Sequence, residues 1–125
     1  MPGDVTGIGP EISAKLIASG ATEDQARVVV IGDKRVFDIG MRDAAIEIPH
    51  TVYHDIGDIT WPRNDLSLLD LANIDPAQFP QGVSSNESGK LSGDTLKFMI
   101  DLALAGKIDG ICFAPLNKGA MNKGG

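Results

Sequence analysis

Gly3-Asp4-Val5-Thr6-Gly7-Ile8-Gly9-Pro10-Glu11-Ile12 stands at the start of this chain of 125 residues and decides how the fold is predicted. Its glycines allow tight turns and a close approach of the backbone to a ligand. Pro10 and Glu11 suit the first turn of a helix. An N–H group in this turn has no partner within the helix, so proline, which has no N–H, loses nothing there. The carboxylate of Glu11 is favoured by the positive end of the helix dipole. The stretch therefore predicts a glycine-rich loop that leads into a helix N-terminus, where anions are favoured.

This loop matches neither of the two common phosphate-binding motifs. A P-loop requires Gly-Lys-Ser/Thr after four intervening residues, and the chain has no such run. The dinucleotide fingerprint requires a glycine where Ile12 stands. A purely structural turn before a helix is therefore the favoured interpretation of the loop on its own, and anion binding is the alternative.

Composition limits the classes of protein that need to be considered. The net charge of −6 argues against general binding to nucleic acid or to an anionic membrane, although local basic residues can still hold a small phosphate. Cys112 is the only cysteine, so no internal disulfide is possible, which fits a reducing compartment. Because Cys112 lies in an apolar run, we expect it to be a small buried residue. Neither a signal peptide nor a membrane span is recognisable, and the predicted location is cytoplasmic.

The first half of the chain predicts alternating helices and strands. Residues 11–19 have apolar side chains at helical spacing, and the β-branched run 27–31 is typical of a buried parallel strand. Asp33 is placed to cap a helix over residues 34–42. Short strands are then predicted at 45–48 and 51–53.

The second half continues the same alternation. Residues 56–64 are loop-like, residues 66–71 form a strand candidate, and residues 73–86 form a long extended connection. A helix is predicted over 90–105, and a buried strand over 108–113. This order predicts an α/β fold, an α/β/α sandwich with a mostly parallel sheet.

Asn117 and Lys118 are candidate ligand-binding residues, because ligands of parallel sheets lie beyond the carboxyl ends of the strands. Lys118 could reach a phosphate or carboxylate, or be an ordinary surface lysine. Asn117 could orient a substrate hydroxyl or cap a following helix, and capping is slightly favoured.

Other polar residues allow a structural and a functional interpretation. Asp4 and Thr6 could contact substrate, and Asp4 could accept a hydrogen bond from a substrate hydroxyl or help to hold a metal. An Asx-turn that shapes the loop is the favoured role for Asp4. His50 and His54 have a spacing that suits a metal on a helix, yet their context favours a strand and a metal site is disfavoured. Residues 84–89 are interpreted as a helix-entry loop rather than an anion contact.

Two motifs together resemble the 4-hydroxythreonine-4-phosphate dehydrogenase family. The opening stretch resembles that family's Gly-Asp-Pro-Ala/Thr-Gly-Ile-Gly-Pro-Glu, and residues 114–118, Ala-Pro-Leu-Asn-Lys, resemble its Ala-Pro-Ile-Asn-Lys. The resemblance implies a fold like that of isocitrate and isopropylmalate dehydrogenases. It implies a homodimer that uses NAD or NADP and a divalent metal (Zn, Mg or Co) to oxidise and decarboxylate a small phosphorylated hydroxy acid. For the parent enzyme this is 4-phosphooxy-threonine, in pyridoxine 5'-phosphate biosynthesis.

The resemblance also implies that residues 1–125 are the N-terminal portion of a larger two-lobed dehydrogenase. The family's metal-binding histidines and Gly-His-Thr motif lie beyond this stretch, so we expect no metal ligand and no catalytic residue here, and no activity from the stretch alone. The family has a strand before the glycine loop, and a sheet without that strand leaves its neighbour exposed. Val5 replaces the usual proline, which slightly favours the sister group acting on D-threonate or D-erythronate 4-phosphate. A non-catalytic fragment or an anion-binding α/β module is the remaining alternative.

The resemblance carries no cofactor-binding residue onto this chain. It supports Lys118 and Asn117 as residues that line the substrate site, near a phosphate or carboxylate. Asp4 and Thr6 are weaker candidates for the same cleft.

Overall fold

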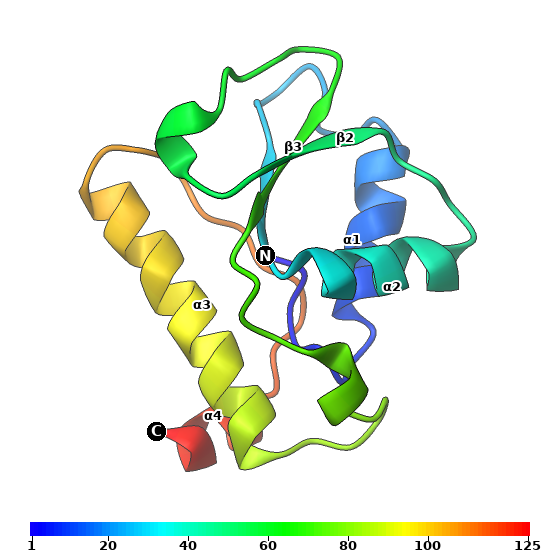
Figure 1. Ribbon diagram of the computed structural model, residues 1–125, viewed down its shortest axis with the longest axis vertical. Coiled ribbons are helices and arrows are strands. Elements are labelled where there is room, and N and C mark those ends of the chain that lie inside the picture. Colours follow the sequence, from blue (N-terminus) through cyan, green and yellow to red (C-terminus); the bar gives the residue numbers. More distant parts are fainter.

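A computed structural model describes residues 1–125 (Figure 1). Its helices and strands follow in the order α1 (Gly9–Ala18), β1 (Val29–Gly32), α2 (Lys34–Ala44), β2 (His50–Tyr53), β3 (Leu66–Asp70), α3 (Asn86–Leu104) and α4 (Lys118–Gly124), with short 3-10 turns at Ile56–Asp58 and Pro76–Gln78. None of the helices combines the length and the apolar character needed to cross a membrane.

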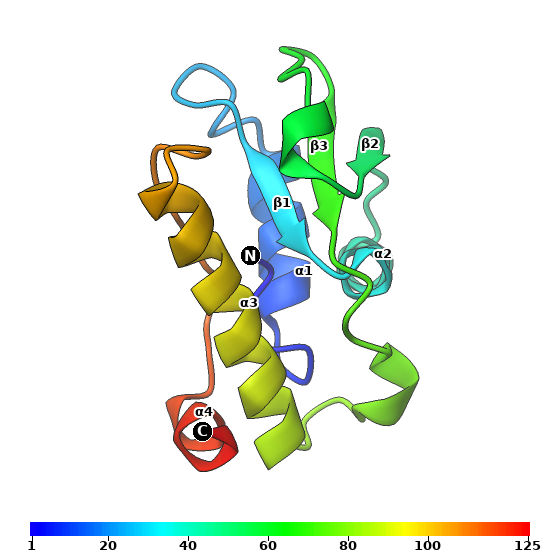
Figure 2. The ribbon, with the colours of Figure 1, turned by 60° about the vertical axis from the view of Figure 1, so that its left-hand side comes forward.

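The strands form one parallel sheet in the order β1-β3-β2. Helices α1 and α2 cover one face of this sheet and α3 covers the other (Figure 2). Successive residues of a strand point to opposite faces. Accordingly Val30 and Leu68 pack with Phe37 of α2, while Ile31 and Leu69 pack with Met99 of α3. The predicted α/β/α arrangement with a parallel sheet is confirmed.

The capping interactions expected at the helix starts are present, although the start of one helix differs from its predicted position. The Asp33 side chain accepts a hydrogen bond from the Arg35 N–H and caps α2 as expected. Ser85 and Ser88 form a reciprocal capping box, which confirms the helix-entry role of residues 84–89. Helix α3 therefore begins at Asn86 rather than Lys90.

The strand predicted over residues 45–48 is wrong. Helix α2 continues to Ala44, and Ala45 then adopts a left-handed conformation with φ of 55° that reverses the chain. Such a turn breaks the extended geometry that a strand needs. Only the second of the two predicted strands forms, as β2.

The buried strand predicted over residues 108–113 is also wrong. This segment belongs to no sheet, Ile111 and Phe113 are 37% and 48% exposed, and Cys112 is exposed rather than buried. It bonds instead to Met1, whose α-amino group donates to the Cys112 carbonyl at 3.1 Å and whose carbonyl accepts from the Ala114 N–H at 3.1 Å. A strand needs a neighbouring strand along its length, and here a cleft takes that place.

This cleft of about 1130 Å³ separates the segment from β1, whose edge away from β3 is unpaired. Its apolar lining comes from α1, β1 and the segment itself: Ile12, Leu16, Ile17, Val29, Ile31, Ile111 and Phe113. Exposed apolar surface beside an unpaired strand edge favours association with other chains.

We expect Leu16→Glu to reduce self-association of the chain, measured by analytical ultracentrifugation over a concentration series. Leu16 is 48% exposed and lines the cleft, so a charge there opposes burial of the cleft against another molecule. Leu104→Glu is the matched control, because Leu104 is 82% exposed but lies outside the cleft. Equal effects of the two substitutions would show that the cleft is not the associating surface.

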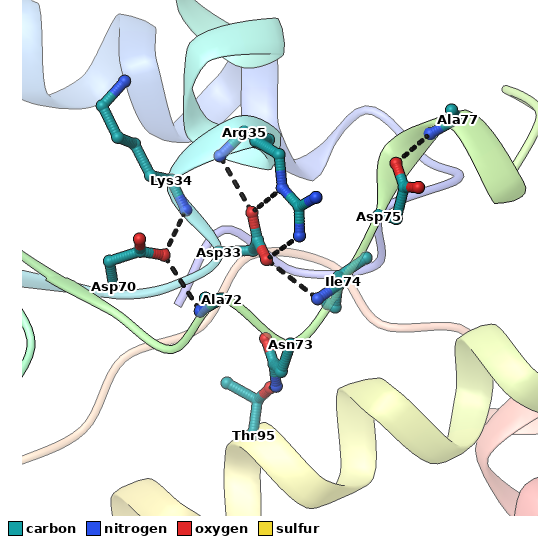
Figure 3. A network of polar contacts seen from close by, with 10 residues as sticks. All are labelled: Asp33, Lys34, Arg35, Asp70, Ala72, Asn73, Ile74, Asp75, Ala77 and Thr95. Carbon is teal, nitrogen blue, oxygen red and sulfur yellow. Dashed lines mark hydrogen bonds and ion pairs between the residues drawn. The ribbon is translucent and has the colours of Figure 1, made fainter.

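Asp33 joins three segments at the carboxyl ends of β1 and β3 (Figure 3). Its buried carboxylate accepts from the Ile74 N–H at 2.8 Å and from the Arg35 guanidinium, through Nε at 3.0 Å and Nη2 at 2.9 Å. Nearby, Asp70 accepts from the N–H groups of Lys34 and Ala72. These bonds tie the start of α2 to the chain that leaves β3.

Burial by itself would raise the pKa of Asp33. The hydrogen bonds from the Arg35 side chain and the Ile74 and Arg35 N–H groups outweigh burial, and the pKa is lowered from 3.8. A lowered folded-state pKa means that the ionised carboxylate stabilises the fold above the ordinary carboxyl pKa. This stabilisation is lost as the pH falls from 3.8 through the lower value of the folded state.

Asp33→Asn should lower the free energy of unfolding at pH 7 by about 1.5–3 kcal/mol, the range for hydrogen bonds to a charged group. The difference from wild type should shrink as the pH falls below 3.8, because the unfolded wild-type chain then takes up a proton and folded Asp33 does so at its lower pKa. Urea denaturation at several pH values measures both effects.

Asp38→Asn is the control for this experiment, because it removes the same charge from an exposed ion pair with Lys34 in the same helix. Such pairs contribute about 0–1 kcal/mol. A destabilisation by Asp33→Asn that did not change with pH would contradict the role of the ionised carboxylate.

Candidate functional site

The opening loop and the segment after residue 113 lie against each other, although they are more than a hundred residues apart in sequence. The Asp4 N–H donates to the Pro115 carbonyl at 3.3 Å. Gly3 has φ of 87°, and a Cβ built on it would lie 2.7 Å from the Pro115 oxygen. A side chain at residue 3 would therefore strain the backbone and separate the two segments. The two motifs singled out in the sequence form one surface.

Met1 strengthens this contact from the other side of Gly3. Its α-amino group is held against the Cys112 carbonyl, and burial lowers the pKa of this amine to about 6.

Asp4 and Thr6 hold the loop in shape. Asp4 is 4% exposed, and its Oδ1 accepts from the Thr6 N–H at 2.9 Å and from the Thr6 hydroxyl at 2.8 Å. This is the Asx-type turn expected from the sequence. Asp4 Oδ2 has no hydrogen-bond donor within the chain, so one carboxylate oxygen remains able to accept from a ligand.

The amino end of α1 carries unpaired hydrogen-bond donors. Pro10 lies in the first turn as predicted, and no side chain caps the helix at Ile8. The N–H groups of Ile8, Gly9 and Glu11 donate to no acceptor in the chain. Free N–H groups at a helix start favour a nearby negative group.

Asn117 and Lys118 differ in what the structure assigns to them. The Asn117 side-chain oxygen accepts from the Ala120 N–H at 2.9 Å and caps α4, so the capping role is confirmed. Lys118 is the first residue of α4, is exposed and forms no ion pair. Four other lysines are each paired with a carboxylate one helical turn away: Lys15, Lys34, Lys90 and Lys97. Lys118 therefore has a charge available for an anionic ligand, three residues after Pro115, whose carbonyl accepts from the Asp4 N–H.

The two histidines are not arranged to hold a metal. His50 Nδ1 lies 2.7 Å from the Ile48 carbonyl, and its ring packs edge-on against Phe37 at 5.8 Å between centroids. No group of three or more His, Cys, Asp or Glu side chains in residues 1–125 is placed to bind a metal ion. These residues therefore do not fit the divalent metal that the family resemblance implies.

Sequence reasoning missed Gln81 and Gly82. The Gln81 side chain donates to the Val5 carbonyl at 3.3 Å, and the Gly82 N–H donates to the Thr6 carbonyl at 2.8 Å. The only signal was the unusual length of the connection over residues 73–86, which indicated either a functional segment or misplaced element boundaries and named no partner.

The chain is similar in sequence to a family model and to named proteins of other organisms. The family model described as pyridoxal phosphate biosynthetic protein PdxA matches residues 24–125. A Pasteurella multocida protein, provisionally named 4-hydroxythreonine-4-phosphate dehydrogenase, is 36% identical over 125 residues, which cover 98% of this chain and 37% of that protein. The D-threonate 4-phosphate dehydrogenase of Cupriavidus necator is 32% identical over 127 residues, with 98% and 37% covered.

A solved structure agrees with this relationship. The crystal structure of a 4-hydroxythreonine-4-phosphate dehydrogenase from Burkholderia phymatum superposes with a TM-score of 0.87 at 31% identity, covering 99% of this chain and 37% of that one. The chain thus spans a little over a third of the length of the proteins that it matches. Because the family model matches most of its residues, the chain belongs to the family of the pyridoxal phosphate biosynthetic protein PdxA.

Proposed function

We propose that this chain forms part of an NAD-dependent dehydrogenase that oxidises and decarboxylates 4-phosphooxy-threonine in pyridoxine 5'-phosphate biosynthesis. The names of the relatives support a dehydrogenase acting on a small phosphorylated acid. The bond between the Asp4 N–H and the Pro115 carbonyl carries the proposal, because it brings both family motifs to one surface. Residues 1–125 would supply one wall of the substrate site.

Each candidate residue has a defined part in this proposal. Lys118 would bind the substrate phosphate or carboxylate as a point charge. Asp4 Oδ2 would accept a hydrogen bond from a substrate hydroxyl or ammonium group, while Thr6 keeps Asp4 in place and lies at the same surface. Asn117 would orient the start of α4, and its amide nitrogen would remain available to substrate.

The sister activity on D-threonate or D-erythronate 4-phosphate is a second candidate. It is favoured by Val5 in place of proline and by relatives that carry the D-threonate name. Following NAD reduction at 340 nm by the complete dehydrogenase, of which residues 1–125 are proposed to form part, tests the choice with each substrate in turn, since the higher kcat/KM identifies the substrate. If neither is oxidised while inorganic phosphate still binds, the third candidate, a non-catalytic anion-binding module, is the better description.

The proposal includes groups that residues 1–125 do not hold. The nicotinamide cofactor, NAD or NADP, would accept the hydride, and a divalent metal would polarise the substrate oxygen. The metal ligands are proposed to lie outside these residues, so residues 1–125 alone should give no turnover. Turnover by residues 1–125 alone would contradict this division of the site.

We further propose that the complete dehydrogenase is a cytoplasmic homodimer.

Lys118→Met should lower kcat/KM for the phosphorylated substrate by roughly 10- to 150-fold, the range for losing a charged hydrogen bond. Lys123→Met is the matched control, because Lys123 is also exposed and unpaired but lies in the last turn of α4. Steady-state kinetics on both variants of the complete dehydrogenase makes the comparison, since residues 1–125 alone should give no turnover. A loss of the same size in both would show that Lys118 has no specific role.

Asn117→Asp separates the capping role from substrate binding. Aspartate caps a helix about as well as asparagine, so the melting temperature should be retained. A carboxylate, however, donates no hydrogen bond and repels an anionic substrate, so KM should rise. Differential scanning calorimetry and steady-state kinetics measure the two quantities. An unchanged KM would leave Asn117 with capping as its only role.

A further inference from the structure

The connection between β3 and α3, residues 71–85, wraps around the opening loop. Ile74 is buried together with Val5 and Val36, and Phe79 packs against this cluster. Ile74 is itself held by the Asp33 carboxylate. The connection is thus anchored to the sheet near its start and then passes over the loop that carries the candidate site.

Gln81 and Gly82 bond the far end of this connection to the loop. They are the only residues of the connection that donate hydrogen bonds to residues 3–9, and they reach the carbonyls of Val5 and Thr6. Gly82 has φ of 77°, a left-handed conformation that glycine adopts at little cost. In this conformation the Gly82 N–H donates to the Thr6 carbonyl at 2.8 Å.

These two bonds pair most of the loop's hydrogen-bond acceptors, and leave the carbonyls of Gly3 and Gly7 without a donor in the chain. The Asp4 carbonyl accepts from the Gly7 N–H, and the carbonyls of Val5 and Thr6 accept from the connection. By contrast, the N–H groups of Val5, Ile8 and Gly9 have no acceptor in the chain. The loop therefore presents free donors to its surroundings and few free acceptors, which is the polarity that a phosphate or carboxylate requires.

We propose that Gln81 is a positioning residue, which with Gly82 forms a clasp that fixes the opening loop in this donor-presenting conformation. The proposal rests on the function proposed above, because it concerns the same loop. Gln81 is exposed, so its bond contributes little to the stability of the whole chain. The bond instead shifts the local equilibrium of the opening loop from an open toward a fixed conformation.

Gln81→Met removes the donor while keeping a side chain of similar length. Gln78→Met is the matched control, because Gln78 lies in the same connection, is exposed and forms no side-chain hydrogen bond. Losing one hydrogen bond should raise the population of the open loop by about 2- to 12-fold. Amide exchange of Thr6 and Gly7, whose N–H groups bond to Asp4, should accelerate by the same factor.

The clasp should also affect substrate binding. In the complete dehydrogenase, KM for 4-phosphooxy-threonine and for D-threonate 4-phosphate should rise in Gln81→Met with the melting temperature unchanged. Both KM and the melting temperature should be retained in Gln78→Met. Gly82→Ala perturbs the clasp independently, since an Ala at φ of 77° is strained although its Cβ would meet open space. It should change exchange and KM in the same direction as Gln81→Met.

The outcomes separate the clasp from the proposed function. Unchanged exchange at Thr6 and Gly7 in both variants overturns the clasp. Faster exchange with unchanged KM overturns its positioning role and leaves a structural bond only. If the complete wild-type dehydrogenase, of which residues 1–125 are proposed to form part, oxidises neither substrate, the proposed function fails. The clasp is then judged by amide exchange and by the affinity for inorganic phosphate in the same variants.

Discussion

The Asp33 carboxylate is the interaction on which the arrangement of this chain most depends. It caps α2, pairs with Arg35 and holds the Ile74 N–H, so three segments meet at one buried charge. A buried carboxylate is costly unless its oxygens are satisfied, and here both are. Because Ile74 packs on Val5, this one residue also determines where the connection crosses the opening loop.

A second constraint is the unpaired edge of β1. In a parallel sheet, each strand supplies the hydrogen bonds that its neighbour needs, and residues 108–113 have no neighbour except Met1. Their apolar side chains therefore line a cleft and remain partly exposed instead of forming a core layer. Strand propensity alone did not produce a strand, because the pairing partner is a property of the whole sheet.

The candidate site follows from how backbone groups are paired. Glycines at positions 3 and 9 let the opening loop lie against residues 114–115 and Pro2, where a Cβ would collide with backbone oxygens. The turn between Asp4 and Thr6 and the bonds from Gln81 and Gly82 use the loop's acceptors. The remaining free donors and the unpaired Lys118 are chemically suited to an acidic, phosphorylated ligand.

The sequence by itself determined the α/β class, the glycine loop before α1, the Asp33 cap and the pairing of two motifs that indicate the family. These features depend on neighbouring residues, since caps, turns and helical periodicity are local. Tertiary structure alone decided that residues 108–113 are not a strand and that Cys112 is exposed. It alone decided the bonds of Gln81 and Gly82 to a loop some seventy-six residues away. Such contacts depend on which segments meet in space, and local patterns of residues do not encode that information.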